Sequence, residues 1–452
     1  MIQNGFSSLP NIDLRQLAAA AACAYGSNSK EIVTYEASAC VLPPGRRFLV
    51  MAGTEEIRNL LLNLRFVKDD IGLIKEFEPF RTMMKSSNFE QYLENFRFAG
   101  DLWAMAEGQM VFAGEPLVRI TAAIPEAVMA ASCILPVLNH AIPVASKAAR
   151  MVLAARGKVV MDAGTDRMHV QIAISAARAA YLVGFSATSN IAAIVKCGIP
   201  PIGAMLHSWI LLHEHEERAF KVLCEAYKGP SIAIDTNDVW NGTILASELM
   251  SFGEVVIESV DPIMVAGGVR KLLDAKDKWI IGVVAAVTDE YEIDRICRSG
   301  APISTFLVTG GLDNQYCEPV NMTYDMVYND TARRPLAWIS SKNAVLPGKK
   351  QVFLDQRNGG WSHLVALESS VVPEDLVPLL DRHISGGVPC EDSSIELEVA
   401  RRYCNAELLG LSQRPNLSSL EPKTEEDVPV YPHQDLKDLF NLAMSKIGRQ
   451  TH

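Results

Sequence analysis

The sequence lacks three features that would narrow its function class at once: a basic surface, paired cysteines and a cleavable leader. Its 452 residues carry 53 acidic and 42 basic side chains, a net charge of −11. Binding nucleic-acid phosphates requires clustered Lys and Arg, so we expect no nucleic-acid partner. The nine cysteines are scattered without a C-x-x-C pair, a distribution typical of reduced, mostly buried thiols in a cytoplasmic protein.

A membrane-spanning segment is also not expected. Residues 1–30 lack the cationic segment followed by an apolar run that a signal peptide requires. The longest uncharged stretch, residues 127–146, has about the length of a membrane span, but it contains Pro136, His140 and Pro143. We therefore interpret it as a buried helix and turn, in a soluble cytoplasmic protein that has no membrane partner.

The composition permits a large core. Hydrophobic residues make up 49% and charged residues 21%, which excludes global disorder, and the length suits two or three domains. In the first third, Ile57–Phe66 has helical spacing and Met110–Ile120 reads as two strands about a Gly114 turn. Near the end, Pro415–Pro432 is predicted to be an extended surface connection. A terminal amphipathic helix is indicated by Leu436, Leu439, Phe440, Ala443 and Ile447.

From about residue 157, apolar β-rich segments alternate with helical patterns for some 150 residues. Such alternation implies a parallel sheet, and short apolar strands favour a barrel over a doubly wound sheet. No G-x-G-x-x-G follows a strand, which weakens a dinucleotide-binding interpretation. The expected strands are Val159–Met161, Ile202–Leu206, Ser231–Ile234, Glu254–Ile257, Trp279–Val287 and Ile303–Val308. The expected helices are Arg167–Tyr181, His213–Tyr227, Asp238–Met250, Val265–Ala275 and Glu290–Arg298.

Polar residues follow five of these strands, where barrel enzymes collect their chemistry. Each segment alone is a weak signal, because a lone histidine is usually structural and D-T-N-D also suits a helix N-cap. Their joint occurrence predicts an active site. The segments are Asp162–Arg167, His207–Ser208, Asp235–Asp238, Glu258–Asp261 and Thr309–Asp313.

Two further clusters are weaker signals of function. His213–Glu217 (HEHEE) has metal-ligand residue types, but consecutive helical residues point in different directions, so we expect a solvated helix start. Leu346–Gln351 (LPGKKQ) is a turn with two cations. It suits either a plain solvated turn or one that faces a phosphate.

At these residues the chain resembles the nicotinate phosphoribosyltransferase family, over most of its length. The matching segments keep the family's order along the chain. They are FLVMAGTEEIRNLLLNLRF (48–66), FRFAGDLWAMAEGQMVFAGEPLVRI (96–120), SKAARMVLAARG (146–157), YLVGFSATSNIAAIVKCGIP (181–200), HS (207–208), DEYEIDRICRSGAPISTF (289–306) and LPGKKQVF (346–353).

The resemblance implies an α/β fold with an irregular α/β barrel of the TIM type and an α/β sandwich domain built from both ends of the chain. We expect the sandwich in residues 1–145 and 336–452 and the catalytic barrel in residues 146–335. It also implies transfer of 5-phosphoribosyl from phosphoribosyl pyrophosphate (PRPP) with Mg²⁺, and ATP that phosphorylates a histidine. Family members form homodimers with the active site at the subunit interface.

The family's motifs assign roles to several residues of this sequence. His207 falls on the phosphorylated histidine, and Asp235 on the first aspartate of D-T-Y-D, where it would stabilise an oxocarbenium-like transition state. Ser189 sits where nicotinate enzymes carry Ser. Arg167 retains the second Arg of G-L-R-R, and other family-like positions would bind substrate phosphates and ribose. These are Lys147, Arg150, Glu258, Asp261, Thr309, Gly310 and Gly311.

Departures from the family concentrate in the pocket. Arg15 and Ala163 replace the two aromatic residues that sandwich the pyridine ring, and Asp166 replaces an arginine. The R-L-D-S-G-D motif becomes V-I-E-S-V-D at residues 256–261, an aspartate becomes Val287, and F-G-V-G-T becomes F-L-V-T-G at residues 306–310. A basic residue of the amino-terminal domain aligns with Cys40 or Val41. The Arg15/Asp166 exchange suggests a more polar acceptor than nicotinate.

Three hypotheses therefore stay open on the sequence. The first is an active phosphoribosyltransferase with an altered, more polar acceptor pocket. The second is a specialised enzyme of the same fold acting on another ribosyl phosphate or nucleotide. The third is a catalytically silent binding homologue. No metal ligands are assigned by the sequence.

Overall fold

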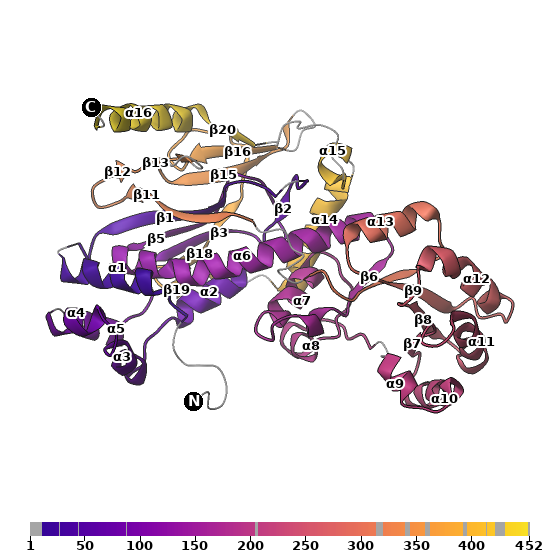
Figure 1. The fold of residues 1–452 in the computed structure, drawn as a ribbon. Helices are drawn as coiled ribbons and strands as arrows, with labels where there is room; N and C mark the ends of the chain where they lie inside the picture. Colours follow the sequence, from indigo (N-terminus) through magenta and orange to yellow (C-terminus); the bar gives the residue numbers. More distant parts are fainter. Residues whose placement is uncertain are drawn as a thin grey trace. The chain divides into compact units, whose positions relative to one another are not determined.

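The computed structural model describes residues 11–450 except 27, 44, 87, 204–206, 313–319, 340–343, 358–361, 392–395, 413 and 421–429. The chain divides into two compact units (Figure 1). The first unit contains Met1–Asn139, Val320–Glu396 and Glu425–His452, and the second contains His140–Pro319 and Leu397–Thr424.

A seven-stranded antiparallel sheet forms the centre of the first unit. Its strand order is β12-β11-β1-β5-β3-β18-β19, so segments from both ends of the chain pair within one sheet. The outer strands are β12 (Arg334–Pro335) and β19 (Val388–Pro389). The inner strands are β11 (Met322–Asn329), β1 (Ile32–Ala39), β5 (Pro116–Ala123), β3 (Asp101–Met105) and β18 (Leu380–Ser385).

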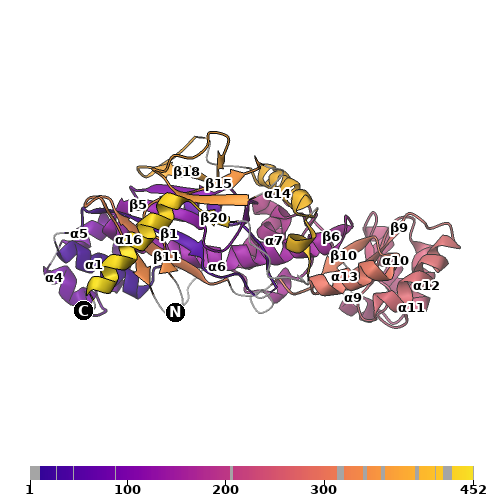
Figure 2. The same ribbon diagram turned by 90° about the horizontal axis from the view of Figure 1, so that it is seen from above.

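Three smaller sheets complete the strands of this unit among the described residues. The four-stranded sheet β17-β15-β16-β20 is covered by α16 (Gln434–Gln450), which contacts β16 (Figures 1 and 2). The predicted terminal helix is thereby confirmed. The four-stranded sheet consists of β15 (Lys350–Asp355), β16 (Ser362–Leu367), β17 (Val377–Pro378) and β20 (Val430–Pro432). The two smaller sheets are the pairs β2 (Leu49–Val50) with β4 (Met110–Val111) and β13 (Trp338–Ile339) with β14 (Ala344–Val345).

The local signals of the first third of the chain are confirmed with shifted bounds. Helix α2 covers Thr54–Asn63, and β4 and β5 flank Gly114, whose φ of +84° suits glycine at a turn. The remaining helices of this part are α1 (Leu14–Tyr25), α3 (Lys68–Ile74), α4 (Phe80–Ser86) and α5 (Phe89–Glu94).

Helix α6 (Ile124–Ala154) corrects one expectation, because it is continuous where we predicted a helix and a turn. Pro136 and Pro143 lie within it, although proline removes a helical hydrogen bond. Burial of apolar side chains offsets that cost, because 72% of the most apolar 18-residue stretch of the helix is buried. The helix is long and apolar enough to cross a membrane, but its burial is that of a core helix.

The L-P-G-K-K-Q turn is also unlike the solvated turn considered above. Lys350 is only 6% exposed and pairs with the carboxylate of Glu36 at 2.8 Å. Its Nζ also donates to the carbonyl oxygens of Leu346 and Gly348. Lys349, one residue earlier, is partly exposed and pairs with Asp330. Both cations are thus committed to ion pairs within the first unit.

The second unit is built on a parallel sheet in the order β6-β10-β9-β8-β7, which confirms the predicted sheet. Isolated bridges from Asp162 to Thr188 and from Thr188 to Pro201 extend it beyond β6. No closure of this sheet into a ring is recorded among the described residues, and the barrel stays a prediction. The strands are β6 (Val159–Asp162), β7 (Ser231–Ala233), β8 (Gly253–Ile257), β9 (Ile281–Val287) and β10 (Thr305–Val308).

Helices connect these strands close to the predicted positions. The expected strand at 202–206 is replaced by a single bridge at Pro201, and residues 204–206 lie outside the described residues. The helices are η1 (Thr165–Arg167), α7 (Ala173–Leu182), α8 (Ile191–Cys197), α9 (His207–Leu211), α10 (Glu216–Ala226), α11 (Val239–Leu249), α12 (Pro262–Asp274) and α13 (Glu290–Ser299).

The division of the chain differs from the expected one at three places, the first being residues 140–145, which were expected in the sandwich and belong to the second unit. Residues 320–335, expected in the barrel, belong to the first unit because β11 pairs with β1. Helix α14 (Leu397–Ser412), expected in the sandwich, belongs to the second unit. Its Arg401 donates to the carbonyl oxygens of Tyr181 and Phe185 at the end of α7, and its guanidinium lies 4.1 Å from the Tyr181 ring centroid.

The segment 415–432 also departs from its prediction. We expected an extended connection, but it begins with a short helix, α15 (Pro415–Ser418), and ends in β20. Strand β20 runs parallel to β16, so the end of the connection is fixed by a sheet. Residues 421–429 lie outside the described residues.

The contrast between the two adjacent lysines gives a stability prediction. Lys350→Met leaves the buried Glu36 carboxylate without its cation, and we expect it to lower the free energy of unfolding by about 3–5 kcal/mol. Lys349→Met is the matched control and should cost about 1 kcal/mol, because its ion pair is partly exposed. Urea unfolding followed by far-UV circular dichroism measures both. Equal losses would contradict the structural role of Lys350.

Candidate active site

Residues at the carboxyl ends of β7 and β8 converge on His207, the first residue of α9. The imidazole Nδ1 shares a 2.8 Å hydrogen bond with the Thr236 hydroxyl. Its Nε2 lies 3.2 Å from a carboxylate oxygen of Glu258 and 3.3 Å from the Ser259 hydroxyl. We call these residues, together with Asp235, the histidine cluster. His207 and Glu258 are 28% and 35% exposed, so the cluster is within reach of a ligand.

Asp235 fixes the geometry of this cluster through hydrogen bonds to its backbone. It is 7% exposed, and its Oδ2 accepts the backbone N–H groups of Glu258 at 2.9 Å and of Ser259 at 2.6 Å. Its Oδ1 is buried and has no hydrogen-bond partner among the described residues. A buried carboxylate oxygen without a partner is costly, which suggests that a ligand, an ion or water completes the site.

A second group of residues lies at the ends of β6 and β10. Ala163 donates its N–H to Val308, which brings the segment after β6 against the segment after β10. A Cβ added to Gly164 would lie 2.8 Å from the backbone nitrogen of Gly310. A glycine is therefore required at position 164 for this approach. We call residues Gly164, Thr309, Gly310 and Gly311 the glycine turn.

Two cations border the glycine turn. A Cβ on Gly310 would lie 3.6 Å from a guanidinium nitrogen of Arg167, and one on Gly311 would lie 3.7 Å from Nζ of Lys147. Lys147 is buried, whereas Arg167 is exposed. Free backbone approach beside two positive side chains is an arrangement suited to an anion such as a phosphate.

Asp162 connects the glycine turn to the segment that carries Ser189. Its carboxylate accepts from the Thr188 hydroxyl at 2.7 Å and from the N–H of Gly164 at 3.0 Å. Its carbonyl accepts from the N–H of Ser189. Burial raises the pKa of Asp162 above its usual value, and the two hydrogen bonds oppose that shift.

The interior below these residues is apolar. Met161, Val256, Val284 and Leu307 form a buried cluster against which the half-buried Ala163 packs. Two positions where the family motifs differ, Val256 and Leu307, therefore belong to one hydrophobic cluster. Both positions carry apolar side chains where the family motifs have an arginine and a glycine.

Two of the expected substrate-binding residues are engaged elsewhere. Arg150 forms a buried ion pair with Glu290 at 3.0 Å, at the start of α13. Asp261 caps the N-terminus of α12 and pairs with Arg295 at 3.0 Å. The guanidinium of Arg295 and the helix N–H hold the pKa of Asp261 below its usual value. Both residues shape the surroundings of the site.

The remaining expected residues are exposed. Asp166 and Ser189 lie on the surface of the second unit, and Thr309 is half-buried. Arg15 lies in the first unit, where it is 89% exposed and pairs with Asp13 at 3.0 Å. Asp313, at the end of the T-G-G-L-D segment, lies outside the described residues.

The structure adds five residues that the sequence reasoning did not single out. Four of them lie inside segments that were already noted for other reasons, whereas Thr288 lies between the predicted strand Trp279–Val287 and the family-like segment 289–306. Hydroxyl groups carry little functional information in a sequence, because Ser and Thr occur in caps and turns everywhere. The residues are Asp162, Thr188, Thr236, Ser259 and Thr288.

Few acidic side chains of the site could hold Mg²⁺. No three His, Cys, Asp or Glu side chains come together as an ion site in the described part of the chain. Mg²⁺ that enters with substrate phosphates needs only one or two carboxylates. Asp235, with its unpartnered Oδ1, and the half-exposed Glu258 offer that donor set, so the histidine cluster fits such an ion.

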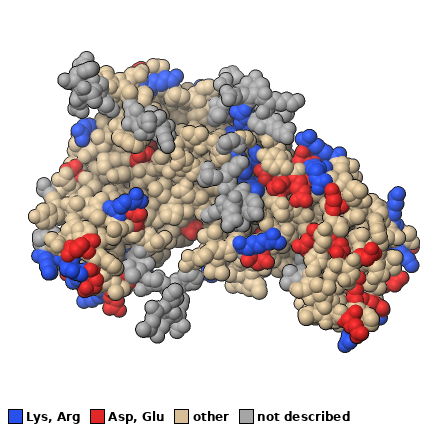
Figure 3. All heavy atoms as spheres, viewed as in Figure 1, with Lys and Arg blue, Asp and Glu red and all other residues tan. Residues whose placement is uncertain are grey.

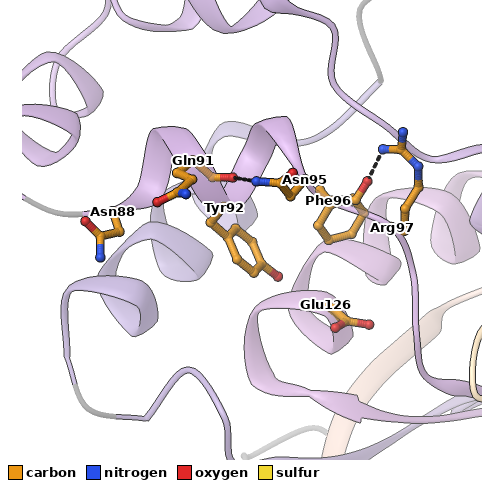
Figure 4. Close-up of a pocket in the computed structure, with 7 residues that line it drawn as sticks. All are labelled: Asn88, Gln91, Tyr92, Asn95, Phe96, Arg97 and Glu126. Carbon is orange, nitrogen blue, oxygen red and sulfur yellow. Dashed lines mark hydrogen bonds between the residues drawn. The ribbon is translucent and has the colours of Figure 1, made fainter.

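Two other surface features of the molecule do not bring reactive groups together. On the face drawn in Figure 3, Lys and Arg are interspersed with Asp and Glu. An open pocket of about 400 Å³ in the first unit is lined by amide side chains, Arg97 and Glu126 around the rings of Tyr92 and Phe96 (Figure 4). Arg97 points away from Glu126 toward the Phe96 carbonyl, so its groups do not converge.

Comparison with known proteins agrees with this arrangement. The nicotinate phosphoribosyltransferase (NAPRTase) N-terminal domain family matches residues 11–139, which end where the first segment of the first unit ends. Human nicotinic acid phosphoribosyltransferase superposes with a TM-score of 0.82 at 19% identity, covering 95% of this chain and 99% of the other. Nicotinate-nucleotide pyrophosphorylase from Pyrococcus furiosus gives 0.73 at 21% identity over 91% and 100%. The fold is therefore that of these transferases.

The curated relatives decide the family. Nicotinate phosphoribosyltransferase pncB2 of Mycobacterium tuberculosis is 31% identical over 84% of this chain and 82% of its own length. The Bacillus subtilis nicotinate phosphoribosyltransferase is 29% identical over 69% and 66%. The chain belongs to the nicotinate phosphoribosyltransferase family, and with it to the pentosyltransferases.

The glycine turn yields a prediction with a matched control. Gly311 has a φ of +79°, and a Cβ there would lie 1.9 Å from the Thr288 carbonyl oxygen. Gly311→Ala should therefore lower the free energy of unfolding by about 3 kcal/mol or weaken the local structure. Gly300→Ala has a similar φ of +74° but open space, and should cost about 1 kcal/mol. Urea unfolding compares them; a smaller loss at Gly311 would contradict the close contact.

Proposed function

We propose that this protein transfers the 5-phosphoribosyl group of PRPP to nicotinate or to a nicotinate-like, more polar acceptor. Family membership supports the reaction class. The observation that carries the proposal is the histidine cluster at the carboxyl ends of β7 and β8, in which Glu258 contacts His207 and Asp235 binds the backbone N–H of Glu258. Carboxylates there would stabilise positive charge that develops on the ribose when pyrophosphate leaves.

His207 would carry the phosphoryl group that couples ATP to the reaction. Its imidazole is held on both nitrogens yet remains 28% exposed, as a nucleophile that must meet a second substrate requires. Mg²⁺ bound to Asp235 and Glu258 would neutralise the phosphates of PRPP. The glycine turn with Lys147 and Arg167 is the proposed phosphate subsite. Asp261 and Arg150 would support it indirectly, without contacting the substrate.

The acceptor would lie between Ala163, Asp166, Ser189 and Arg15. The apolar cluster under Ala163 suits the face of a heterocycle, and the charges of Asp166 and Arg15 suit polar substituents on it. Arg15 belongs to the first unit, so we propose that it reaches the site from the partner subunit of a homodimer. The barrel form of the parallel sheet and a cytoplasmic location belong to the same proposal.

The histidine cluster predicts the outcome of three substitutions. His207→Ala should reduce formation of nicotinate mononucleotide by about 100-fold or more, because the nucleophile is lost. Asp235→Asn should reduce it by about tenfold or more. His213→Ala is the control, because the His213 imidazole contacts Trp209 and lies outside the cluster. The assay is chromatography of PRPP, ATP, Mg²⁺ and nicotinate mixtures.

If the wild-type protein forms no product with nicotinate but forms one with another pyridine acid, the proposed reaction holds and the acceptor is that other acid. Absence of any PRPP consumption would contradict the proposed function. In that case a catalytically silent homologue, or an enzyme acting on another ribosyl phosphate, becomes the better explanation.

The acceptor proposal has its own prediction. Arg15→Ala and Asp166→Ala should each raise the acceptor KM roughly tenfold while kcat changes little, because each removes one charged contact. Arg298→Ala is the control, since it removes an exposed arginine that pairs with Asp294 on α13. Steady-state kinetics at saturating PRPP measures the effect. Unchanged KM in both variants would rule out these residues as the acceptor site.

A further inference from the structure

Two buried polar side chains lie one residue before the two positions that would line the acceptor. Asp162 precedes Ala163, and Thr188 precedes Ser189. Asp162 and Thr188 are each 1% exposed. The Thr188 hydroxyl donates to the Asp162 carboxylate at 2.7 Å. Burial of a carboxylate is costly without hydrogen bonds, so Asp162 depends on this contact.

The hydrogen bonds of the Thr188 hydroxyl have a defined direction. The backbone N–H of Asn190 can only donate, and it reaches the Thr188 oxygen at 3.2 Å. The hydroxyl hydrogen is therefore directed to Asp162, whose other carboxylate oxygen accepts the N–H of Gly164 at 3.0 Å. One hydroxyl thus joins the segment at residues 188–190 to the carboxylate that holds Gly164.

The backbone places Ala163 and Ser189 side by side. A parallel bridge pairs Asp162 with Thr188, and the N–H of Ser189 donates to the Asp162 carbonyl at 2.9 Å. Side chains alternate between the two faces of a sheet, so the residues that follow this pair lie on its opposite face. Ala163 packs there against the apolar cluster that includes Met161. The Asp162–Thr188 contact therefore lies behind the two proposed acceptor contacts.

The segment around Ser189 is also anchored on its other side. The N–H of Thr188 donates to the Pro200 carbonyl, and the Thr188 carbonyl accepts the N–H of Ile202, both at 3.0 Å. The side chain of Asn190 caps the N-terminus of α8. Ser189 is thus an exposed residue between two anchored ones, and the direction of its side chain is set by the backbone before any ligand binds.

We propose that Thr188 is the positioning residue of the acceptor site: its hydroxyl ties the segment of Ser189 to the Asp162 carboxylate and thereby sets the spacing between Ser189 and Ala163. The inference rests on the proposed function for its kinetic consequence, whereas the tie is a property of the folded protein alone. Thr188 touches no substrate and acts through the backbone beside it. Contacts that are fixed before binding reduce the ordering cost of binding, so loss of the tie weakens acceptor binding.

The first test compares the KM of the acceptor with that of PRPP. In the isosteric Thr188→Val variant the acceptor KM should rise about tenfold, the loss expected for one hydrogen bond to a charged group. The KM for PRPP should stay within about twofold, because Gly164 keeps its bond to Asp162. Thr188→Ser should restore the acceptor KM, since it restores the hydroxyl.

Ser186→Ala is the matched control, because its hydroxyl lies in the same segment but donates to the Val160 carbonyl, at 3.2 Å. It should leave both KM values within about twofold. An unchanged acceptor KM in Thr188→Val, or an equal rise in both KM values, would overturn the positioning role.

The second test requires no turnover. Hydrogen exchange of the full-length protein, followed by mass spectrometry of peptides that cover residues 186–192, reports on the N–H groups of Ser189 and Asn190. In Thr188→Val the Asn190 N–H loses its acceptor, so exchange in these peptides should be about tenfold faster, and Thr188→Ser should exchange like wild type. Equal exchange in wild type and Thr188→Val would overturn the tie. A wild-type protein that consumes no PRPP would contradict the proposed function instead, and the exchange measurement would still decide whether Thr188 fixes this segment.

Discussion

The geometry of the candidate site depends on one carboxylate that binds backbone. Oδ2 of Asp235 accepts two consecutive N–H groups, those of Glu258 and Ser259, and so fixes the segment after β8 to the segment after β7. Hydrogen bonds from a carboxylate to N–H groups are among the stronger ones in proteins. Among the described residues, the polar contacts of the His207 side chain with Thr236, Glu258 and Ser259 are all made by the two segments that this interaction joins. A shift of Asp235 would therefore displace both faces of the imidazole together.

The acidic and the cationic parts of the site are separated along one sheet edge. The histidine cluster follows β7 and β8, while the glycine turn with its two cations follows β6 and β10. Parallel strands bring all these ends to the same edge. A substrate that carries both a ribose and phosphates can extend across such an edge, with opposite charge requirements met at different strands. Under the proposed function, this division would allow an acidic chain to bind an anionic substrate.

The sequence predicted the parallel sheet well because its signals are local. Short apolar strands and helix caps are encoded in consecutive residues. Asp238, in the D-T-N-D segment considered as an N-cap, caps α11, and Asp261 and Asp289 cap α12 and α13, although those two caps were not predicted from the sequence. Long-range effects were missed. The continuity of α6 through Pro143 depends on burial against distant segments, and the burial of Lys350 depends on Glu36, which is 314 positions earlier in the chain. The pairing of α14 with α7 through Arg401 is likewise invisible to a local pattern.

The close approach of Gly164 to Gly310 has a consequence for how this family member can change. A side chain at position 164 would collide with the backbone of Gly310, so this position cannot change unless the two loops move apart. New acceptor preferences would thus arise, in nature or in directed evolution, at positions where a side chain already projects, such as Ala163, Asp166 and Ser189. In a library that randomises the glycine turn, most variants would have side chains that keep the two loops apart. A library that leaves the turn unchanged would sample acceptor specificity directly.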